Sequence, residues 1–468
     1  MFYKVIMLTG LIGLNSFGSV GQAKKVYDSR LSLTKKYRAM VIELVDAGLH
    51  FSAVPWMKEY LTRSKSSFDT KLEKAFEEMV AVVGPRQLET LPLRYLRRKN
   101  SNSLYYVIAK KKMRAGDIRN AANYADRVNS NHPISPFASN LLAAANSNIG
   151  KYSTALSNFK ECQRLSESMM TKTDSQLVRG QLEVNRDYCL LGEARTLFAM
   201  KDYKKAELRY LDIPKSSPIW PEVLFEEAWT SYYLNNYNRT LGKLVTYKAP
   251  VFDYVFNPEI ETLRALSYLK MCLYNDAKQI SDNFYRKYLQ PARKLRLYLK
   301  RNKSNYNRYY RMMADFEKMN KADSKLLGTL LKSVEREGAY KEIRESLISA
   351  AQELDKVKSL RRSSFKRALG NNLNEVIQSQ KKLMGAYVRS RLVGKYADLY
   401  RAFEGMSYIK LEVLEQRKAR LYRFDSDKGK RGDIKYIDRN EKQYFWNFNG
   451  EFWADELGDY VFALGSEC

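Results

Sequence analysis

Gly116-Asp117-Ile118-Arg119-Asn120-Ala121 is the first copy of a six-residue motif that returns along the chain. The further copies are Gly150-Lys151-Tyr152-Ser153-Thr154-Ala155, Lys201-Asp202-Tyr203-Lys204-Lys205-Ala206, Asn235-Asn236-Tyr237-Asn238-Arg239-Thr240 and Cys272-Leu273-Tyr274-Asn275-Asp276-Ala277. Their first residues are 34, 51, 34 and 37 positions apart. A period near 34 residues is typical of helical hairpins stacked into a solenoid. Residues 102–290 are therefore expected to form about five helix-turn-helix repeats.

Small and large side chains fall at fixed places in these copies. A small residue begins the second helix, a large aromatic residue follows four positions later, and proline ends two of the units. The expected packing residues are Ala121, Ala155, Ala206, Ala277, Phe159, Tyr210, Pro133 and Pro218. The first helices carry Ala109, Ala143, Ala194, Ala228 and Ala265 at the matching place. Three positions depart from the pattern: Thr240 replaces alanine, Ser281 replaces a large residue and Cys272 replaces the glycine of the turn.

This pattern resembles the tetratricopeptide repeat over about 190 of the 468 residues. The resemblance implies an all-α solenoid with a concave groove for a peptide or a partner helix. It implies no reaction, since function belongs to sites and not to the architecture that holds them.

The chain is strongly basic, with a formal net charge of +29. A field of this size favours anionic partners. Residues 1–23 have the pattern of a cleaved secretory signal: Lys4 is followed by a mostly apolar run and by small residues at Gly21 and Ala23. Cleavage is expected after Ala23, and an uncleaved membrane anchor is the alternative. We expect an exported protein, periplasmic or associated with the outer membrane and not integral to it, for which nucleic acid is no routine partner.

Four cysteines, Cys162, Cys189, Cys272 and Cys468, are compatible with two disulfides in an oxidising compartment. Cys162 and Cys189 fall on neighbouring repeat helices, so their pairing is geometrically reasonable. Cys272 with Cys468 would then tie the chain end to the last repeat. The alternative is that all four are buried free thiols, which behave as small apolar side chains.

A basic segment follows the repeats. Between Asp282 and Asp315 there is no acidic residue, while cations and tyrosines alternate. Such a mixture suits an anionic partner, and the alternative is a solvated helix face. The candidate binding residues are Arg286, Lys287, Arg293, Lys294, Arg296, Lys300, Arg301 and Lys303, followed by Arg308 and Arg311.

The rest of the chain divides by composition. Residues 24–101 are expected to form helices that cap the repeats, and 291–424 the basic segment and long helices, as a projecting hairpin or coiled coil or packed on the same molecule. A helix break is expected at Gly370-Asn371-Asn372. Residues 425–468 form a loop and an aromatic, acidic tail that either folds back or engages a partner.

Catalysis has little material in this sequence. Glu451, Asp455, Glu456 and Asp459 lie near Trp446 and Trp453, a mixture that glycosidases use. Carboxylates at such spacing are nevertheless common on any surface. The only histidines are His50 and His132, too few for a histidine triad or a multi-histidine metal site. We therefore expect no enzyme, no cofactor and no metal.

The order of these segments resembles the periplasmic repeat proteins of gliding and predatory deltaproteobacteria, in particular the adventurous gliding motility proteins. The resemblance is carried by Glu222-Val223-Leu224-Phe225-Glu226-Glu227-Ala228-Trp229 with Tyr237, by residues 258–277 with Cys272, and by residues 444–460. It implies a scaffold that assembles other envelope proteins. The alternative function is binding of an anionic envelope polymer, peptidoglycan or lipopolysaccharide.

Overall fold

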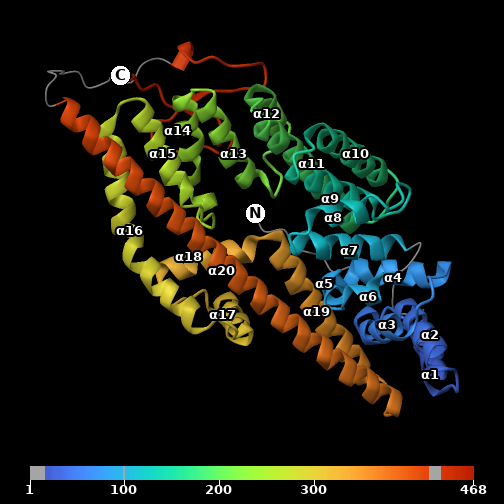
Figure 1. Cartoon of the computed structure of the whole chain (residues 1–468). Coiled ribbons are helices and arrows are strands. Elements are labelled where there is room, and N and C mark those ends of the chain that lie inside the picture. Colours follow the sequence, from blue (N-terminus) through green and yellow to red (C-terminus); the bar gives the residue numbers. More distant parts are fainter. Residues whose placement is uncertain (1–15, 98–100, 421–433) are drawn as a thin grey trace. The chain divides into compact units, whose positions relative to one another are not determined.

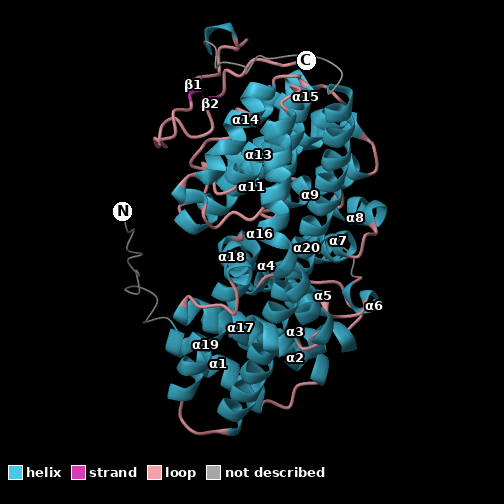
Figure 2. Ribbon diagram, turned by 90° about the vertical axis from the view of Figure 1, so that its left-hand side faces the viewer, coloured by secondary structure: helices cyan, strands magenta, loops and turns pink. Residues whose placement is uncertain are grey.

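The computed structural model describes residues 16–97, 101–420 and 434–468. Helices make up 74% of the structure, with twenty α-helices in the described residues and two strands of two residues each (Figures 1 and 2). The all-α class expected from the sequence is confirmed at this level. The chain forms two compact units: Met1–Ile149 with Lys341–Met384, and Gly150–Tyr340 with Gly385–Cys468. The division between Ile149 and Gly150 falls inside the expected repeat segment.

The first unit gathers helices from both halves of the sequence. Its helices are α1 (Ser16–Asp28), α2 (Leu33–Asp46), α3 (His50–Arg63), α4 (Thr70–Val83), α5 (Arg86–Glu89), α6 (Leu93–Leu96), α7 (Asn102–Arg114), α8 (Ile118–Ala125) and α9 (Ser135–Asn148), with most of α19 (Gly338–Ser359) and the beginning of α20 (Ser364–Arg420). The expected cleavage point after Ala23 lies within α1, where Ala23 is buried. Within the described residues no helix is long and apolar enough to cross a membrane.

One apolar core holds this unit together. It joins residues of α2, α3 and α4, such as Leu44, Phe51 and Phe76, to Val357 of α19 and Leu373 of α20. Glu353 of α19 also accepts hydrogen bonds from the backbone N–H groups of Phe51 and Ser52 (2.9 and 2.7 Å), in the first turn of α3. The terminal N–H groups of a helix have no partner within it, so α19 satisfies them from outside. The segment 24–101 therefore packs on the long helices as well as on α7.

The prediction of a helix break at Gly370-Asn371-Asn372 was wrong. Helix α20 runs through these residues without interruption. The helical conformation is interrupted earlier, between the end of α19 at Ser359 and the start of α20 at Ser364, and Ser363 Oγ accepts from Lys366 N (3.1 Å). Leu369 and Leu373, on either side of Gly370, are fully buried in the core. Their burial outweighs the roughly 1 kcal/mol by which glycine disfavours a helix interior.

The second unit contains the later helix pairs and the chain end. Its elements are α10 (Tyr152–Met170), α11 (Gln176–Ala199), α12 (Tyr203–Tyr210), α13 (Trp220–Tyr233), α14 (Tyr237–Val245), η1 (Thr246–Lys248), η2 (Pro250–Phe252), α15 (Glu259–Lys270), α16 (Tyr274–Arg301), α17 (Tyr306–Met319), α18 (Lys325–Arg336), the rest of α20, η3 (Ile434–Tyr436), β1 (Trp446–Asn447) and β2 (Tyr460–Val461). The 17 extra residues between the second and third motif copies lengthen α10 and α11.

The five motif copies share one backbone conformation at their first residue. The φ angle is positive at Gly116, Gly150, Lys201, Asn235 and Cys272, between 59° and 79°. Each of these residues follows the first helix of a pair, where a left-handed residue ends the helix and turns the chain. The turn is therefore kept even where glycine is replaced. The small residues expected at the helix contacts, Ala109, Ala121, Ala143, Ala155, Ala194, Ala206, Ala228, Ala265 and Ala277, are all fully buried.

The large residues of the pattern are buried as well, and the two prolines are not. Phe159 and Tyr210 are 3% and 2% exposed. The Phe159 ring lies so close to Gly192 of α11 that a β-carbon there would stand 2.2 Å from it. Pro133 and Pro218 are exposed and lie in the turns before α9 and α13.

The departures from the repeat pattern have local explanations. Thr240 is buried and its hydroxyl donates to Asn236 O (3.1 Å), so its polar atom has a partner. Ser281 lies where helix α20 passes, and its hydroxyl donates to Met406 O (3.4 Å). A large residue at 281 would hold α20 away. Cys272 is bonded to Cys468.

From Gly385 onward, α20 belongs to the second unit and makes close contacts with other helices of that unit. A β-carbon at Gly385 would stand 2.0 Å from the carbonyl oxygen of Tyr306, and one at Gly405 would stand 2.8 Å from Thr262. Arg391 and the buried Lys395 both pair with Glu337, at 2.7 and 3.6 Å. Residues 385–416 of α20 therefore lie against helices of their own unit, and a projecting hairpin is not what the structure shows for them.

Candidate binding surfaces

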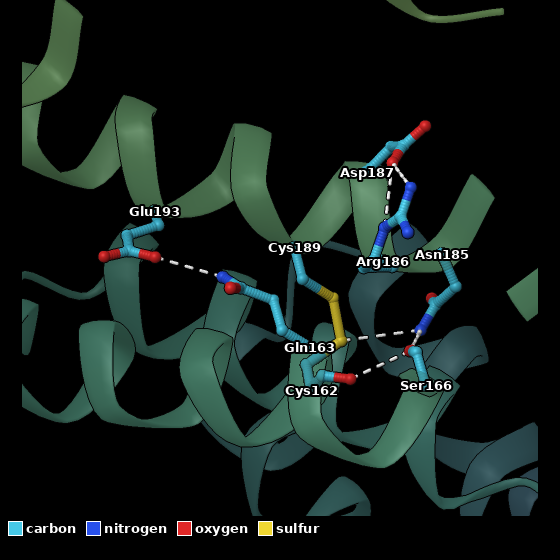
Figure 3. The surroundings of a disulfide bond; sticks show 8 residues. All are labelled: Cys162, Gln163, Ser166, Asn185, Arg186, Asp187, Cys189 and Glu193. Atoms are coloured by element: carbon cyan, nitrogen blue, oxygen red, sulfur yellow. Dashed lines mark hydrogen bonds and ion pairs between the residues drawn. A yellow bond between two sulfur atoms is a disulfide. The ribbon is translucent and has the colours of Figure 1, made fainter. Parts of the chain in front are cut away.

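Two disulfides are present in the structure, and they join the pairs that the sequence made reasonable. Cys162 of α10 is bonded to Cys189 of α11, and Cys272 to Cys468. Figure 3 shows the first bond: Ser166 Oγ donates to Cys162 O (2.8 Å), and the Asn185 amide donates to Ser166 Oγ (3.1 Å). This bond and its polar neighbours lie between two long helices, where they act as a structural clamp.

The aromatic tail folds back on the second unit. Strands β1 and β2 pair in parallel, with Trp446 opposite Tyr460. The side-chain amide of Asn238, on α14, bridges the backbone of Leu464: it accepts from Leu464 N (3.0 Å) and donates to Leu464 O (3.2 Å). Phe462 N also donates to Asn238 O (3.2 Å). The tail is thus bound as an extended peptide, and its end is tied by Cys468.

Apolar contacts complete the docking of the tail. Phe452 and Leu457 pack on Trp220, Leu224 and Phe252. Tyr460 and Val461 are each 1% exposed. Of the two alternatives for the tail, the structure shows the one in which it is docked.

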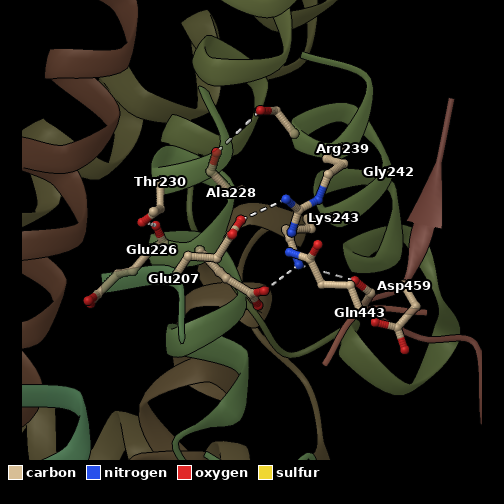
Figure 4. A network of polar contacts seen from close by, with 12 residues as sticks. Glu207, Glu226, Ala228, Thr230, Arg239, Gly242, Lys243, Gln443 and Asp459 are labelled. Carbon is tan, nitrogen blue, oxygen red and sulfur yellow. Dashed lines mark hydrogen bonds and ion pairs between the residues drawn. The ribbon is translucent and has the colours of Figure 1, made fainter. Parts of the chain in front are cut away.

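Two ion pairs lie buried under the tail (Figure 4). Arg239 pairs with Glu207 at 2.7 Å, and Lys243 pairs with Glu227 at 2.5 Å, all four side chains being less than 10% exposed. The tail adds Phe445, whose ring centre lies 5.3 Å from the Arg239 guanidinium. Buried charges are tolerated where they are paired. The tail therefore covers two ion pairs, although Arg239 Nε and Gln443 Nε2 are buried without a hydrogen-bond partner among the described residues.

The carboxylates considered for catalysis lie in this docked tail. Asp459 pairs with Lys215 at 2.6 Å, and Asp455 contributes its backbone oxygen to the same lysine (3.2 Å). In the first unit, His50 and His132 lie 3.1 and 3.3 Å from Glu78 and Glu77. Within the described residues no three or more His, Cys, Asp or Glu side chains form a group able to hold a metal ion.

The basic segment carries ten exposed cations, a set that we call the basic ridge. Its ten cations, on α16, on α17 and in the turn between them, are all exposed and form no ion pair with other described residues. They are Arg286, Lys287, Arg293, Lys294, Arg296, Lys300, Arg301, Lys303, Arg308 and Arg311. The nearest preceding acid, Asp282, is occupied by Lys278 (2.6 Å) and Lys410 (2.8 Å), which also hold its pKa below the usual range.

The geometry of α16 aligns these cations. Arg286, Arg293 and Lys300 recur every seven residues, as do Lys287, Lys294 and Arg301. Seven residues are nearly two turns, so each column keeps one face with steps of about 10.5 Å. The buried residues of this stretch, Phe284, Ala292, Leu295 and Leu299, lie on the opposite face. The structure therefore turns a basic composition into two parallel columns of free cations.

Beside the ridge lies a cavity of about 430 Å³. It is bounded by Lys248 at the end of η1, by α15 and by α16. Its lining, which we call the polar cavity, is Lys248, Glu261, Arg264, Tyr268, Asp276, Gln279, Ile280, Asn283, Phe284, Lys287 and Tyr288. Arg264 and Glu261 pair with each other at 2.6 Å. Burial and the neighbouring Arg264 lower the pKa of Lys248, while burial raises the pKa of Asp276.

Sequence reasoning missed this cavity and one further surface. An exposed apolar stripe follows the outer side of α20; it consists of Val393, Tyr400, Tyr408, Leu411 and Leu414. The buried residues of the same stretch, among them Leu399, Met406 and Val413, lie on the opposite side. The sequence places apolar residues on two different sides of this helix. Which of the two sides is buried depends on contacts with residues distant in sequence.

Comparison with known proteins adds no identification. No family model matches the chain, and no curated protein matches it.

Proposed function

We propose that this protein is a non-catalytic binding protein of the bacterial cell envelope that holds an anionic polymer along the basic ridge. The observation that carries the proposal is the set of ten exposed cations without an ion-pair partner in the described residues. Like charges aligned on one helix repel each other, and a bound polyanion relieves this repulsion. Binding also releases the counterions that were condensed on the polyanion. A structural role for the ridge would not require the cations to be left unpaired.

The rest of the second unit supports the ridge as the binding surface. The helix pairs, their left-handed turns and their buried alanines support a tetratricopeptide-type array. In such an array a partner is expected along the repeat helices. Here α20 already lies against α15 and α16, and the tail already covers α14. The ridge cations remain exposed, and they have no ion-pair partner in the described residues.

The experiment is a binding titration of the purified chain with fluorescently labelled poly-L-glutamate, which offers carboxylates and no sugar. The test variant is Arg286→Ser, Arg293→Ser, Lys300→Ser. The matched control is Lys151→Ser, Lys160→Ser, Lys204→Ser, which removes the same charge from exposed residues of α10, α12 and the preceding turn.

We expect the ridge variant to bind at least about tenfold more weakly than the control variant, because three cation–carboxylate contacts are lost from one site. Equal weakening by both variants would mean that net charge alone attracts the polymer, and it would refute the ridge as the site. Absence of binding by the unmodified chain would refute the proposal altogether.

A second candidate function is a protein scaffold, of the kind implied by the resemblance to gliding-motility proteins. The observation that favours it is the exposed apolar stripe of α20, because large exposed apolar side chains gathered on one face of a helix suit a protein partner. The test is recovery of crosslinked partners from cell envelopes by the unmodified chain and by Tyr408→Glu, Leu411→Glu. Discrete partners lost in this variant, and kept in the ridge variant, would favour the scaffold over polymer binding.

A further inference from the structure

The polar cavity next to the ridge is lined by neutral polar and aromatic side chains as well as by charged ones. Of its eleven lining residues only Ile280 and Phe284 are purely apolar. The others are three cations, two carboxylates, two side-chain amides and two tyrosines. A cavity of this volume falls within the roughly 300–1,000 Å³ that small ligands occupy. Its lining offers both donors and acceptors, together with aromatic surface.

One stripe of α16 presents four of the lining residues. Asp276, Ile280, Asn283 and Lys287 follow at spacings of four, three and four residues, so they share one side of the helix. Asp276, Gln279 and Asn283 are exposed, and within the described residues they form no hydrogen bond to another side chain. Asp276, Gln279 and Asn283 therefore offer donors and acceptors that no other described side chain occupies, whereas the charges under the tail are paired with each other.

The aromatic side of the cavity is held in place. The Tyr288 ring lies 5.0 Å from Phe284 and 6.1 Å from Phe256, ring centre to ring centre. The Nζ of Lys287 lies 4.9 Å from the centre of the same ring. A rigid tyrosine beside a cation presents apolar surface and positive charge together.

We propose that the polar cavity binds an acidic oligosaccharide, with an acidic sugar unit between α15 and α16. Amides and carboxylates hydrogen-bond to sugar hydroxyls as donor and acceptor, and tyrosine surface covers the apolar faces of the sugar ring. Lys248 and Lys287 supply the positive charge that an acidic substituent requires, since Arg264 is already paired with Glu261.

This inference rests on the proposed function, since Lys287 belongs to both the cavity and the ridge. It adds the ligand class: the ridge recognises charge, whereas the cavity recognises a sugar that bears charge. A polymer held along the ridge would place one of its acidic sugars in the cavity. The two claims differ in what they require of the ligand, and this difference makes them separable.

The test uses three probes: a glucuronate-containing tetrasaccharide, its carboxyl-reduced neutral form, and poly-L-glutamate. The cavity variant is Gln279→Ala, Asn283→Ala, two exposed positions on a helix where alanine is well tolerated. The control is Arg293→Ser, Lys300→Ser, which changes the ridge away from the cavity. Binding is measured by calorimetry on the full-length chain.

We expect the cavity variant to bind the acidic tetrasaccharide about tenfold more weakly or worse, with affinity for poly-L-glutamate unchanged within about twofold, because two hydrogen bonds to sugar are lost and no charge is. The neutral tetrasaccharide should bind more weakly than the acidic one. Binding of poly-L-glutamate without binding of the tetrasaccharide, or a tetrasaccharide affinity that the cavity variant leaves unchanged, would overturn the inference. Binding of the tetrasaccharide alone, lost in the cavity variant, would support the inference and refute the ridge as a polymer site.

Discussion

The backbone of Gly242 lies directly against the carbonyl oxygen of Tyr460: a β-carbon at position 242 would stand 1.7 Å from that oxygen. Gly242 is inside α14, where glycine is otherwise unfavourable. Its absence of a side chain lets the tail reach the helix.

Gly242→Ala is therefore expected to lower the free energy of unfolding by about 2–3 kcal/mol, because the tail must move away from α14. The matched control is Gly328→Ala in α18, where the added methyl meets only an ordinary contact at 3.6 Å. That control should raise stability by up to about 1 kcal/mol through helix propensity. Denaturant unfolding measures both. A stabilised Gly242→Ala variant would show that the tail is not docked as described.

Lys201 has a positive φ of 63° in the turn before α12, and this conformation lowers the stability of the fold. A side chain in this conformation costs about 1–2 kcal/mol, which glycine avoids at some cost in unfolded-state entropy. We expect Lys201→Gly to raise the free energy of unfolding by about 0.5–1 kcal/mol. Lys204→Gly, three residues later within α12, should lower it by up to about 1 kcal/mol. If both variants changed the free energy of unfolding in the same direction, the left-handed conformation at Lys201 would be contradicted.

Asp69 links the stability of the first unit to pH. Asp69 is the N-cap of α4: its side chain accepts from Lys71 N and Leu72 N (both 3.1 Å) and from Arg38 at 2.6 and 2.8 Å. The hydrogen bond from Arg38 is the main cause that lowers its pKa from 3.8 to about 2. Because the folded pKa is the lower one, this contribution is present above pH 3.8 and is lost as the pH falls towards about 2.

Asp69→Ala should reduce stability at neutral pH by about 1 kcal/mol, the usual effect of losing a helix cap. Asp69→Asn keeps the cap but cannot ionise, so it should flatten the pH dependence in that window. Circular dichroism during denaturant unfolding between pH 2 and 5 measures this. An unchanged slope in Asp69→Asn would exclude Asp69 as the titrating group.

The disulfide between Cys272 and Cys468 joins two residues that are 196 positions apart in the sequence. Its loss in Cys468→Ser should lower stability by about 2–4 kcal/mol, because the unfolded chain is no longer constrained. In the unmodified protein, oxidised and then denatured, thiol labelling should find no free cysteine. In Cys468→Ser it should find one, at Cys272. Labelling of all four cysteines in the oxidised protein would contradict both bonds.

Local patterns predicted the helix pairs well, because their signals lie within one motif: the turn residue, the buried alanine and the large residue four later. The same repeat frame made the pairs Cys162–Cys189 and Cys272–Cys468 geometrically reasonable but left free thiols as the alternative, and the structure has both bonds. The break expected at Gly370 failed because burial of Leu369 and Leu373 by distant helices decided the outcome. The tail and the first unit could not be placed for the same reason. The ridge was visible as composition, whereas the polar cavity combines three separate elements and no local pattern reveals it.

The central claim is that the ridge cations bind a polyanion together. The most direct test is the salt dependence of poly-L-glutamate binding by the unmodified chain and by Arg286→Ser, Arg293→Ser, Lys300→Ser. Each cation engaged releases counterions, so the logarithmic slope should become shallower by about two in the triple variant. An identical slope for both proteins would show that these cations do not contact the polymer, and the account of the ridge would be wrong.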